Sequence, residues 1–274
     1  MLVVIPARFG STRLPGKALA DIHGQPMIAR VVQAALRSAQ VEHVFVATDH
    51  AAIAAAAERA GASAVLTDPA LPSGTDRVAA AVRQIGGDAP FVLNVQGDEP
   101  LLPPCAIARV VAALRADAGA DMATLSSPLT RADVLDPNRV KVVVSPVMRA
   151  LYFSRAPIGV PRAEVERATR AERDEERGPL EANAPVGGRA ARRHLGIYGF
   201  RREALFRFVQ MPPSPLELAE GLEQLRALEA GMHIAVAEIG SAHRGVDTMD
   251  DLVAMRAEFG AAPFAGGGVG NGPS

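Results

Sequence analysis

A loop near the N-terminus carries three cations among glycines, directly after a short apolar run at residues 2–6. The cations are Arg8, Arg13 and Lys17. Glycines allow a backbone to wrap closely around an anion, and the cations would neutralise the charge of phosphates. The loop is not a P-loop, because five residues separate its glycines instead of four and Ala18 follows the lysine in place of Ser or Thr. The pattern favours a polyphosphate site over a surface turn with scattered cations.

Carboxylates follow two further apolar runs, which places them at the ends of expected strands. Asp98 follows the run at residues 91–95, and Asp247 follows a strand-like run and a Gly-Val turn. A carboxylate in this position can hold Mg²⁺ against nucleotide phosphates, because this ion takes one or two carboxylates and keeps its other positions for phosphate and water. Two alternatives stay open: Asp98 caps the following helix or ends a turn, or Glu99 replaces either aspartate as the ligand.

Two more segments place polar side chains where a ligand could meet them. Residues 73–77, Ser-Gly-Thr-Asp-Arg, precede a helix, so Ser73 or Thr75 is expected to cap it, and a helix start can also hydrogen-bond to a nucleotide. His194 and Tyr198 lie four residues apart in a strand-like run, so they point to one face and could bind one sugar together. The alternative for His194 is a core histidine whose ring is satisfied by its neighbours.

A helical pattern at residues 216–230 carries a third pair of polar side chains. Glu217 and Gln224 are seven residues apart, two turns along one face of the expected helix, where they could reach hydroxyl groups. The alternative is that both side chains are simply solvated.

Short apolar runs alternate with helical patterns over the first half of the chain. Helical connections force parallel pairing, so the pattern predicts an α/β fold with a doubly wound, mostly parallel nucleotide-binding sheet. The expected strands lie at residues 2–6, 44–48, 64–67, 91–96 and 122–126, and the expected helices at 27–39, 51–60, 75–85 and 104–116.

The alternation changes after about residue 138. We interpret residues 139–205 as a smaller inserted β-rich region, and residues 1–260 as a single domain that contains it. The tail at 261–274 is rich in glycine and is expected to be flexible. The remaining expected elements are strands at 140–144, 150–153, 195–200 and 234–237, a mixed-charge stretch at 162–177, a Gly/Arg-rich mobile loop at 183–193 and a closing helix at 250–258.

The composition argues against several classes of function. The 274 residues have a formal net charge of −1, so no overall field attracts nucleic acid or an anionic membrane. With no tryptophan and two tyrosines, few rings are available for stacking on bases. The single cysteine, Cys105, excludes an intramolecular disulfide, and no apolar stretch approaches a signal-peptide core or a membrane span. We therefore expect a cytoplasmic protein that binds neither nucleic acid nor membrane.

Seven short motifs follow the N-terminal loop in a fixed order. They are SGTDR at 73–77, NVQGDEP at 94–100, YFSR at 152–155, HLGIYG at 194–199, PSPLE at 213–217, LEQLR at 222–226 and GVDT at 245–248. The N-terminal loop is similar to the signature loop of sugar-nucleotide pyrophosphorylases. Read together over roughly residues 2–258, the loop and the motifs resemble the 3-deoxy-manno-octulosonate cytidylyltransferases, and seven motifs in one order are far more specific than any one alone.

The resemblance implies a fold of the nucleotide-diphospho-sugar transferase type. It also implies transfer of CMP from CTP to 3-deoxy-D-manno-octulosonate (Kdo) with release of pyrophosphate, for lipopolysaccharide biosynthesis, by a homodimer with Mg²⁺ as cofactor. The implied roles are catalysis by Arg8, Arg13, Lys17, Asp98 and Asp247, metal binding by Asp98 and Asp247, nucleotide binding by Ala7, Arg8, Ser73, Gly74, Arg77 and Gln96, and binding of the acid sugar by Arg155, His194, Tyr198, Glu217 and Gln224.

The segment between residues 156 and 193 departs from the family pattern. It looks longer than the usual connection and reads Gly-Val at 159–160 before its second proline. In the family, elements of the sugar site and of the subunit contact lie nearby. A cytidylyltransferase for another acidic sugar therefore stays open as an alternative. A catalytically silent nucleotide-binding module also stays open, because a loop that cradles phosphates does not itself prove turnover.

Overall fold

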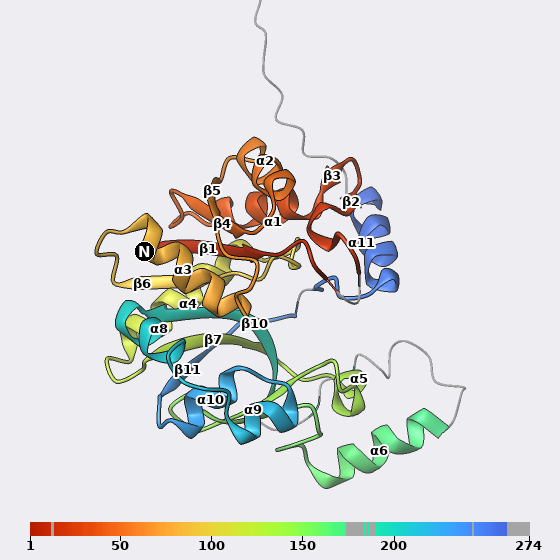
Figure 1. Ribbon diagram of the computed structural model, residues 1–274. Helices are drawn as coiled ribbons and strands as arrows, with labels where there is room; N and C mark the ends of the chain where they lie inside the picture. The colour runs from red at the N-terminus through yellow and green to blue at the C-terminus, as the bar shows by residue number, and fades with distance from the viewer. Residues whose placement is uncertain (12–13, 174–183, 185, 187–189, 243, 262–274) are drawn as a thin grey trace, which may run out of the picture.

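The computed structural model describes the chain except residues 12–13, 174–183, 185, 187–189, 243 and 262–274 (Figure 1). Arg13, the C-terminal tail and part of the expected mobile loop therefore lie outside the described residues.

The strands are β1 (Leu2–Ala7), β2 (Asp21–Ile22), β3 (Gln25–Pro26), β4 (Val44–Thr48), β5 (Ser63–Leu66), β6 (Phe91–Asn94), β7 (Met122–Ser127), β8 (Lys141–Val144), β9 (Ala150–Ser154), β10 (Ala191–Arg201) and β11 (Ile234–Glu238). The helices are η1 (Lys17–Leu19), α1 (Met27–Leu36), α2 (Ala51–Arg59), α3 (Gly74–Ile85), α4 (Pro104–Ala116), α5 (Arg131–Leu135), α6 (Arg162–Arg173), α8 (Arg202–Phe208), α9 (Pro215–Glu220), α10 (Gln224–Glu229) and α11 (Met249–Ala261).

Nine of the described strands form one sheet. Seven follow the order β11-β7-β10-β6-β1-β4-β5, and the hairpin of β8 and β9 is added through β10. The strand β1 pairs in parallel with β4 and β6, β4 with β5, and β7 with β11, whereas β10 runs antiparallel to its neighbours. The fold class predicted from the alternating pattern, an α/β protein with a mostly parallel central sheet, is confirmed.

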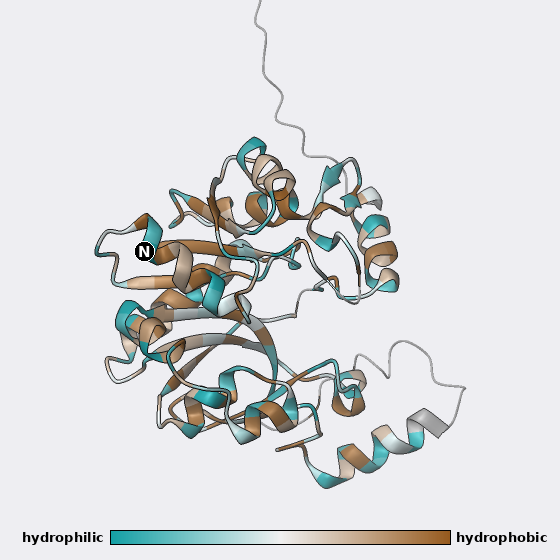
Figure 2. Cartoon of the chain, in the orientation of Figure 1, coloured by the Kyte–Doolittle hydropathy of each residue, from teal (hydrophilic) through white to brown (hydrophobic). Residues whose placement is uncertain are grey.

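Helices cover both faces of the sheet, as a doubly wound fold requires. Side chains of α1, α2, α4 and α11 pack on one face, and side chains of α3, α8 and α10 pack on the other. Within β1, Val3 and Ile5 belong to the first core and Val4 to the second, because neighbouring residues of a strand point to opposite faces. Figure 2 shows hydrophobic residues along the central strands and hydrophilic residues on outer turns.

The inserted β-rich region extends the main sheet. Its strand β8 pairs with the first residues of β10, and β9 pairs with β8. A third, smaller apolar cluster joins α5 to α6 through Val134 and Ala168. In Figure 1, α6 lies at the outer edge of the molecule beyond α5.

Two local expectations are wrong. Residues 191–193 are not loop, because they are the first residues of β10 and pair with β8. The pattern at 216–230 is not one helix, because Gly221 takes a left-handed conformation (φ 63°) and ends α9 before α10 begins. Glycine adopts this conformation without a steric penalty, and it is the usual residue for ending a helix. The argument that Glu217 and Gln224 share one helix face therefore fails.

Within the described residues, no helix has both the length and the apolar character needed to cross a membrane.

Candidate active site

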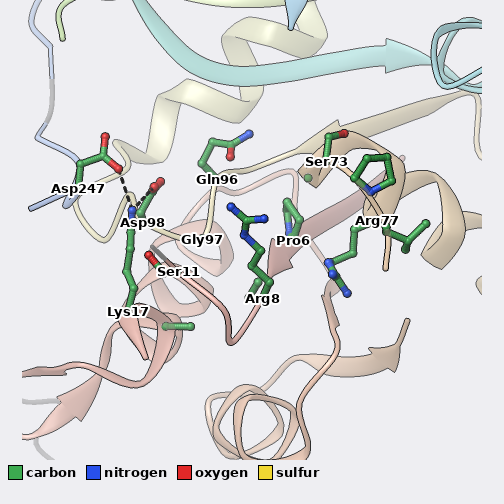
Figure 3. Close-up of a pocket in the computed structure, with 15 residues that line it drawn as sticks. Pro6, Arg8, Ser11, Lys17, Ser73, Arg77, Gln96, Gly97, Asp98 and Asp247 are labelled. Atoms are coloured by element: carbon green, nitrogen blue, oxygen red, sulfur yellow. Dashed lines mark hydrogen bonds and ion pairs between the residues drawn. The ribbon is translucent and has the colours of Figure 1, made fainter. Parts of the chain in front are cut away.

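A pocket lies at the carboxyl ends of β1 and β6, the edge where α/β sheets commonly bind ligands. Its volume is about 280 Å³, comparable to the smaller sites that bind small molecules. The sequence-predicted residues that line it are Ala7, Arg8, Lys17, Ser73, Gly74, Arg77, Gln96, Asp98 and Asp247. Figure 3 shows the lysine and the two aspartates at one end, Ser73 and Arg77 at the other, and Arg8 with Gln96 between them.

The Lys17 ammonium lies between the two predicted metal ligands. Its Nζ is 2.6 Å from Asp98 Oδ2 and 2.9 Å from Asp247 Oδ1 (Figure 3). Burial would lower the pKa of Lys17, but the two carboxylates outweigh burial and raise it. Burial raises the pKa of Asp98, and Lys17 opposes that effect. Carboxylate oxygens from two distant segments of the chain thus converge on one cation beside the pocket.

The loop that carries Asp98 fits against β1 because residue 97 is glycine. A Cβ atom at Gly97 would lie 2.8 Å from the backbone oxygen of Pro6. The loop that carries Asp247 is tied to the same place, since the Val246 N–H donates to the carbonyl oxygen of Asp98 over 2.9 Å. Asp98 does not cap the following helix, because Pro103 is the N-cap residue of α4. The expected cap is therefore wrong, whereas Asp98 does lie in a turn, at residues 97–98.

Asp247 is fixed from the other side by the first turn of α11. The Asp251 carboxylate accepts the N–H of Asp247 over 3.1 Å and the N–H of Thr248 over 3.0 Å. The Thr248 hydroxyl also donates to it, and in return accepts the N–H of Asp251. This reciprocal cap sets the backbone from which the Asp247 carboxylate projects.

The start of α3 combines a cap with a link to the segment around α10. Ser73 accepts the N–H of Asp76, so the expected cap is confirmed and Ser73 is the residue that makes it. The Thr75 hydroxyl donates to Glu223 Oε2 over 2.8 Å, and the Ser73 hydroxyl lies 2.8 Å from Glu223 Oε1 and 2.7 Å from Asp76 Oδ2. Burial raises the pKa of Glu223 against the effect of these hydrogen bonds.

The two described arginines of the pocket differ in how they are held. Arg8 is exposed, and among the described residues it makes no hydrogen bond or ion pair. Arg77 is 2% exposed, and its guanidinium donates to the Thr67 hydroxyl and, over 3.2 Å, to Asp49 Oδ2. Arg8 is therefore available for an anion, whereas Arg77 is fixed by the protein.

His194 and Tyr198 lie outside the pocket lining, on one face of β10. Their ring centroids are 5.5 Å apart, so the expectation that they share a face is confirmed. Burial lowers the pKa of His194 to about 3, which keeps the ring neutral at pH 7. Burial also raises the pKa of Tyr198 well above its usual value.

The tautomer of His194 follows from its neighbour. Its Nε2 is 2.9 Å from the hydroxyl of Thr124, and that hydroxyl has carbonyl oxygens of Leu195 and Ile197 within hydrogen-bond distance. One hydroxyl proton goes to a carbonyl, so Nε2 carries the ring proton and donates it to Thr124. The Nδ1 atom is then an acceptor without a partner among the described residues.

The other predicted sugar-binding residues are engaged in different ways. Arg155 donates to three backbone oxygens, those of Glu220, Pro137 and Gly221. Glu217 accepts two hydrogen bonds from the Arg226 guanidinium, at 2.7 and 2.6 Å. Gln224 is 4% exposed, and its Nε2 has no hydrogen-bond partner among the described residues. Of these three residues, only Gln224 has a buried polar atom without a hydrogen-bond partner among the described residues.

Sequence reasoning missed several residues that the fold brings to the site. Ser11, Ala18, Leu71 and Pro72 line the pocket, and Glu223 joins it to α10. Glu223 lies in the LEQLR motif that also contains Gln224. That motif is the only signal that could have drawn attention to it, because a glutamate near a helix start is otherwise ordinary.

The comparisons with known proteins agree with this geometry. A family model described as "Cytidylyltransferase" matches residues 2–234. The chain belongs to the cytidylyltransferase family. The expectation of a nucleotidyltransferase is thereby confirmed, and the family resemblance read from the motifs is confirmed by the relatives.

Relatives match this cytidylyltransferase along almost their whole lengths. The 3-deoxy-manno-octulosonate cytidylyltransferase of Anaeromyxobacter sp. (strain Fw109-5) is 48% identical over 261 residues, which are 95% of this chain and 97% of that protein. The enzyme of the same name from Bradyrhizobium sp. (strain ORS 278) is 45% identical over 93% of this chain and 96% of its own. A solved structure of CMP:2-keto-3-deoxy-manno-octonic acid synthetase complexed with CTP is 38% identical, with a TM-score of 0.80, over 94% of this chain and 98% of that one.

Proposed function

We propose that this cytidylyltransferase transfers CMP from CTP to Kdo and releases pyrophosphate. The observation that carries the proposal is the cluster in which Lys17, from a glycine-containing loop, lies between Asp98 and Asp247 at the carboxyl edge of the sheet. Relatives named for this activity match the chain over nearly its full length. The related solved structure is named as a complex with CTP.

The chemistry requires no covalent intermediate on the protein. The hydroxyl at the anomeric carbon of Kdo attacks the α-phosphorus of CTP, and an oxygen–phosphorus bond forms there. The bond from the α-phosphorus to the oxygen bridging the β-phosphate breaks, and pyrophosphate leaves with that electron pair. The hydroxyl proton passes to solvent. Negative charge builds up on the leaving group, so Arg8, Arg13 and Lys17 would act by fixing and neutralising the β- and γ-phosphates.

The donor set at Asp98 and Asp247 fits Mg²⁺. Oxygens of both carboxylates already converge on one cation, the Lys17 ammonium. Mg²⁺ takes one or two carboxylates and completes its shell with phosphate and water, so two carboxylates are enough to hold it. The bound ion would supply positive charge against the α-phosphate and the attacking hydroxyl.

The sugar would lie on the β10 side of the pocket. His194 offers an acceptor at Nδ1 and Gln224 a buried amide donor, so the two side chains are complementary to hydroxyl groups. Tyr198 lies beside His194, and Arg155 supplies positive charge for a carboxylate. The Glu217 carboxylate is bound to Arg226 of α10, and we assign it to holding the helix that carries Gln224.

We further propose a homodimer that uses the hairpin of β8 and β9. Leu151 on the edge strand β9 and Val147 in the turn before it are exposed by 59% and 75%, and exposed apolar side chains at a sheet edge favour association. Size-exclusion chromatography with light scattering tests this, and a monomer at micromolar concentration contradicts it. A cytoplasmic location and a place in lipopolysaccharide biosynthesis remain predictions from the sequence.

Pyrophosphate release with CTP, Mg²⁺ and Kdo tests the activity directly. We expect release only when all three are present, with Asp98→Asn as the inactive control. N-acetylneuraminate in place of Kdo tests the alternative of another acidic sugar, to which the unusual segment at 159–160 points. A protein that binds CTP but releases no pyrophosphate with either acid is the silent binding module.

A further inference from the structure

Asp49 follows β4 directly and touches two parts of the pocket at once. Its Oδ1 accepts the backbone N–H of Phe9 over 3.0 Å, and its Oδ2 accepts from Arg77 Nη2 over 3.2 Å. The Asp49 side chain is 10% exposed and that of Arg77 is 3% exposed. A single shielded carboxylate therefore joins helix α3 to the N-terminal loop that carries Arg8 and Lys17, which we call the phosphate loop.

The contact with the phosphate loop acts on Arg8. The N–H that Asp49 accepts belongs to the peptide unit between Arg8 and Phe9. Because a peptide unit is planar, fixing this N–H also fixes the Cα atom of Arg8. Arg8 lines the pocket and has no partner among the described residues. Its direction therefore depends on the backbone that Asp49 holds.

The neighbouring residue supports the same loop. The ring of His50 stacks on the ring of Phe9, with centroids 4.1 Å apart and an angle of 11° between the planes. His50 also caps α2 by accepting the N–H of Ala52. Since Phe9 is 44% exposed, this stack and the Asp49 hydrogen bond are contacts that hold an otherwise open part of the loop.

The contact with α3 acts on Arg77. The Arg77 guanidinium is held between Asp49 and the hydroxyl of Thr67, and Thr67 in turn donates to the backbone oxygen of Thr48 at the end of β4. Arg77 is thus anchored at the end of β4, the same strand end that holds the phosphate loop. One strand terminus fixes two cationic side chains that reach the pocket from different elements.

We propose that Asp49 is a positioning residue that aligns Arg8 and Arg77 for the triphosphate of the nucleotide. The inference rests on the proposed function for the identity of the nucleotide. Asp49 lies behind the two arginines and acts through them. A carboxylate is needed because it has two acceptor oxygens, whereas an asparagine at 49 would turn an N–H₂ group towards one of the two donors.

Two variants of Asp49 and one matched control test the inference. Asp49→Asn keeps the shape of the side chain, so we expect it to fold, and Asp49→Ala removes both contacts. The control is Asp117→Asn at the opposite edge of the sheet, because Asp117 also accepts one backbone N–H, from Gly119, and one arginine, Arg149. The measurements are the Michaelis constants for CTP and for Kdo, the affinities for CTP and CMP by calorimetry, and the melting temperature.

Both Asp49 variants are expected to raise the Michaelis constant for CTP on the order of tenfold or more, because small misplacements of binding groups are costly. The constant for Kdo should change by less than about twofold, and the affinity for CTP should fall far more than the affinity for CMP, which lacks the two outer phosphates. Asp117→Asn should lower the melting temperature and leave both Michaelis constants and both nucleotide affinities unchanged.

A merely structural Asp49 would give a different result. In that case the variants would lower the melting temperature while the CTP and CMP affinities stayed unchanged or fell equally, and the inference would be overturned. Turnover by the unaltered enzyme tests the proposed function separately. If the unaltered enzyme releases no pyrophosphate, the ratio of CTP to CMP affinity in Asp49→Asn still decides the role of Asp49.

Discussion

The two edges of the central sheet use the same residue types in opposite ways. At the amino edge, where β7 and β9 begin, Asp117 and Arg149 are paired one to one, with two contacts of 2.7 Å. At the carboxyl edge, Asp98 and Asp247 share the single ammonium of Lys17. The first arrangement pairs one carboxylate with one guanidinium, whereas in the second two carboxylates converge on one ammonium.

The environments of the two clusters reinforce this difference. The Arg149 hydrogen bonds lower the pKa of Asp117 to about 2, at a site that is partly open to water. Burial raises the pKa of Asp98 instead, even with Lys17 in contact. A carboxylate paired one to one with a guanidinium contributes to stability, while two carboxylates that converge on one ammonium beside a pocket are suited to a ligand. The comparison predicts that substitutions at the carboxyl edge change activity and those at the amino edge change stability.

The largest effect is expected at the two carboxylates of the carboxyl edge. Asp98→Asn and Asp247→Asn keep the side-chain shape and remove one charge, so each should lower turnover on the order of a hundredfold or more. Pyrophosphate release at increasing Mg²⁺ concentration measures this, with Asp117→Asn as the control that retains activity. Should either variant keep both its activity and its Mg²⁺ dependence, that aspartate is structural and Glu99 becomes the candidate ligand.

The next effect concerns the cation between these carboxylates. Lys17→Met should lower turnover, because the β- and γ-phosphates lose a neutralising charge, with little change in folding. In the absence of nucleotide it should also bind Mn²⁺ more tightly, on the order of tenfold, because the ammonium no longer competes for Asp98 and Asp247. Electron paramagnetic resonance of free Mn²⁺ measures this without turnover. Unchanged or weaker Mn²⁺ binding would show that Lys17 does not compete with the metal.

The sequence placed Lys17 and Asp98 at one edge of the sheet for a physical reason, but it did not predict their ion pair. Lys17 lies in a loop with glycines, and Asp98 follows an apolar strand, so the position of each at a strand end is visible locally. That the two meet Asp247 depends on distant elements, and the resemblance to a family supplied that part. Asp49 carries no such local signal, because an aspartate between a strand and a helix is ordinary until the fold brings Phe9 and Arg77 against it.

The sequence failed where a single residue decided between two structures. The pattern at 216–230 has the spacing of one amphipathic helix, and a glycine within it is compatible with that reading. Gly221 instead takes a left-handed conformation, so α9 and α10 diverge and Glu217 turns to Arg226. Helical periodicity reports which faces are apolar, but it cannot report the backbone conformation of a permissive residue.

A smaller effect is expected on the sugar side of the carboxyl edge. His194→Ala should raise the Michaelis constant for Kdo roughly tenfold and change that for CTP little, because a ground-state contact to the sugar is lost. The pKa of about 3 keeps His194 neutral, so the enzyme's dependence on pH should show no step near 6.5 that this variant removes. A rise confined to CTP, or a step near 6.5 that disappears in the variant, would place His194 in a different role.

The smallest effect is expected at the amino edge and depends on pH. The pKa of Asp117 is lowered to about 2 in the folded protein, below the value of about 3.9 for a free aspartate. Its ion pair with Arg149 therefore contributes to stability above about pH 4, and this contribution is lost as the pH falls towards 2.

Asp117→Asn should lower the melting temperature by roughly 2 °C at pH 7, the scale of one partly exposed pair, and the difference from the unaltered protein should shrink as the pH falls below about 4. Thermal unfolding of both proteins between pH 7 and pH 2.5 measures this. A difference that stays constant with pH would mean that Asp117 acts through packing, and a loss of turnover in the variant would remove the contrast between the two edges.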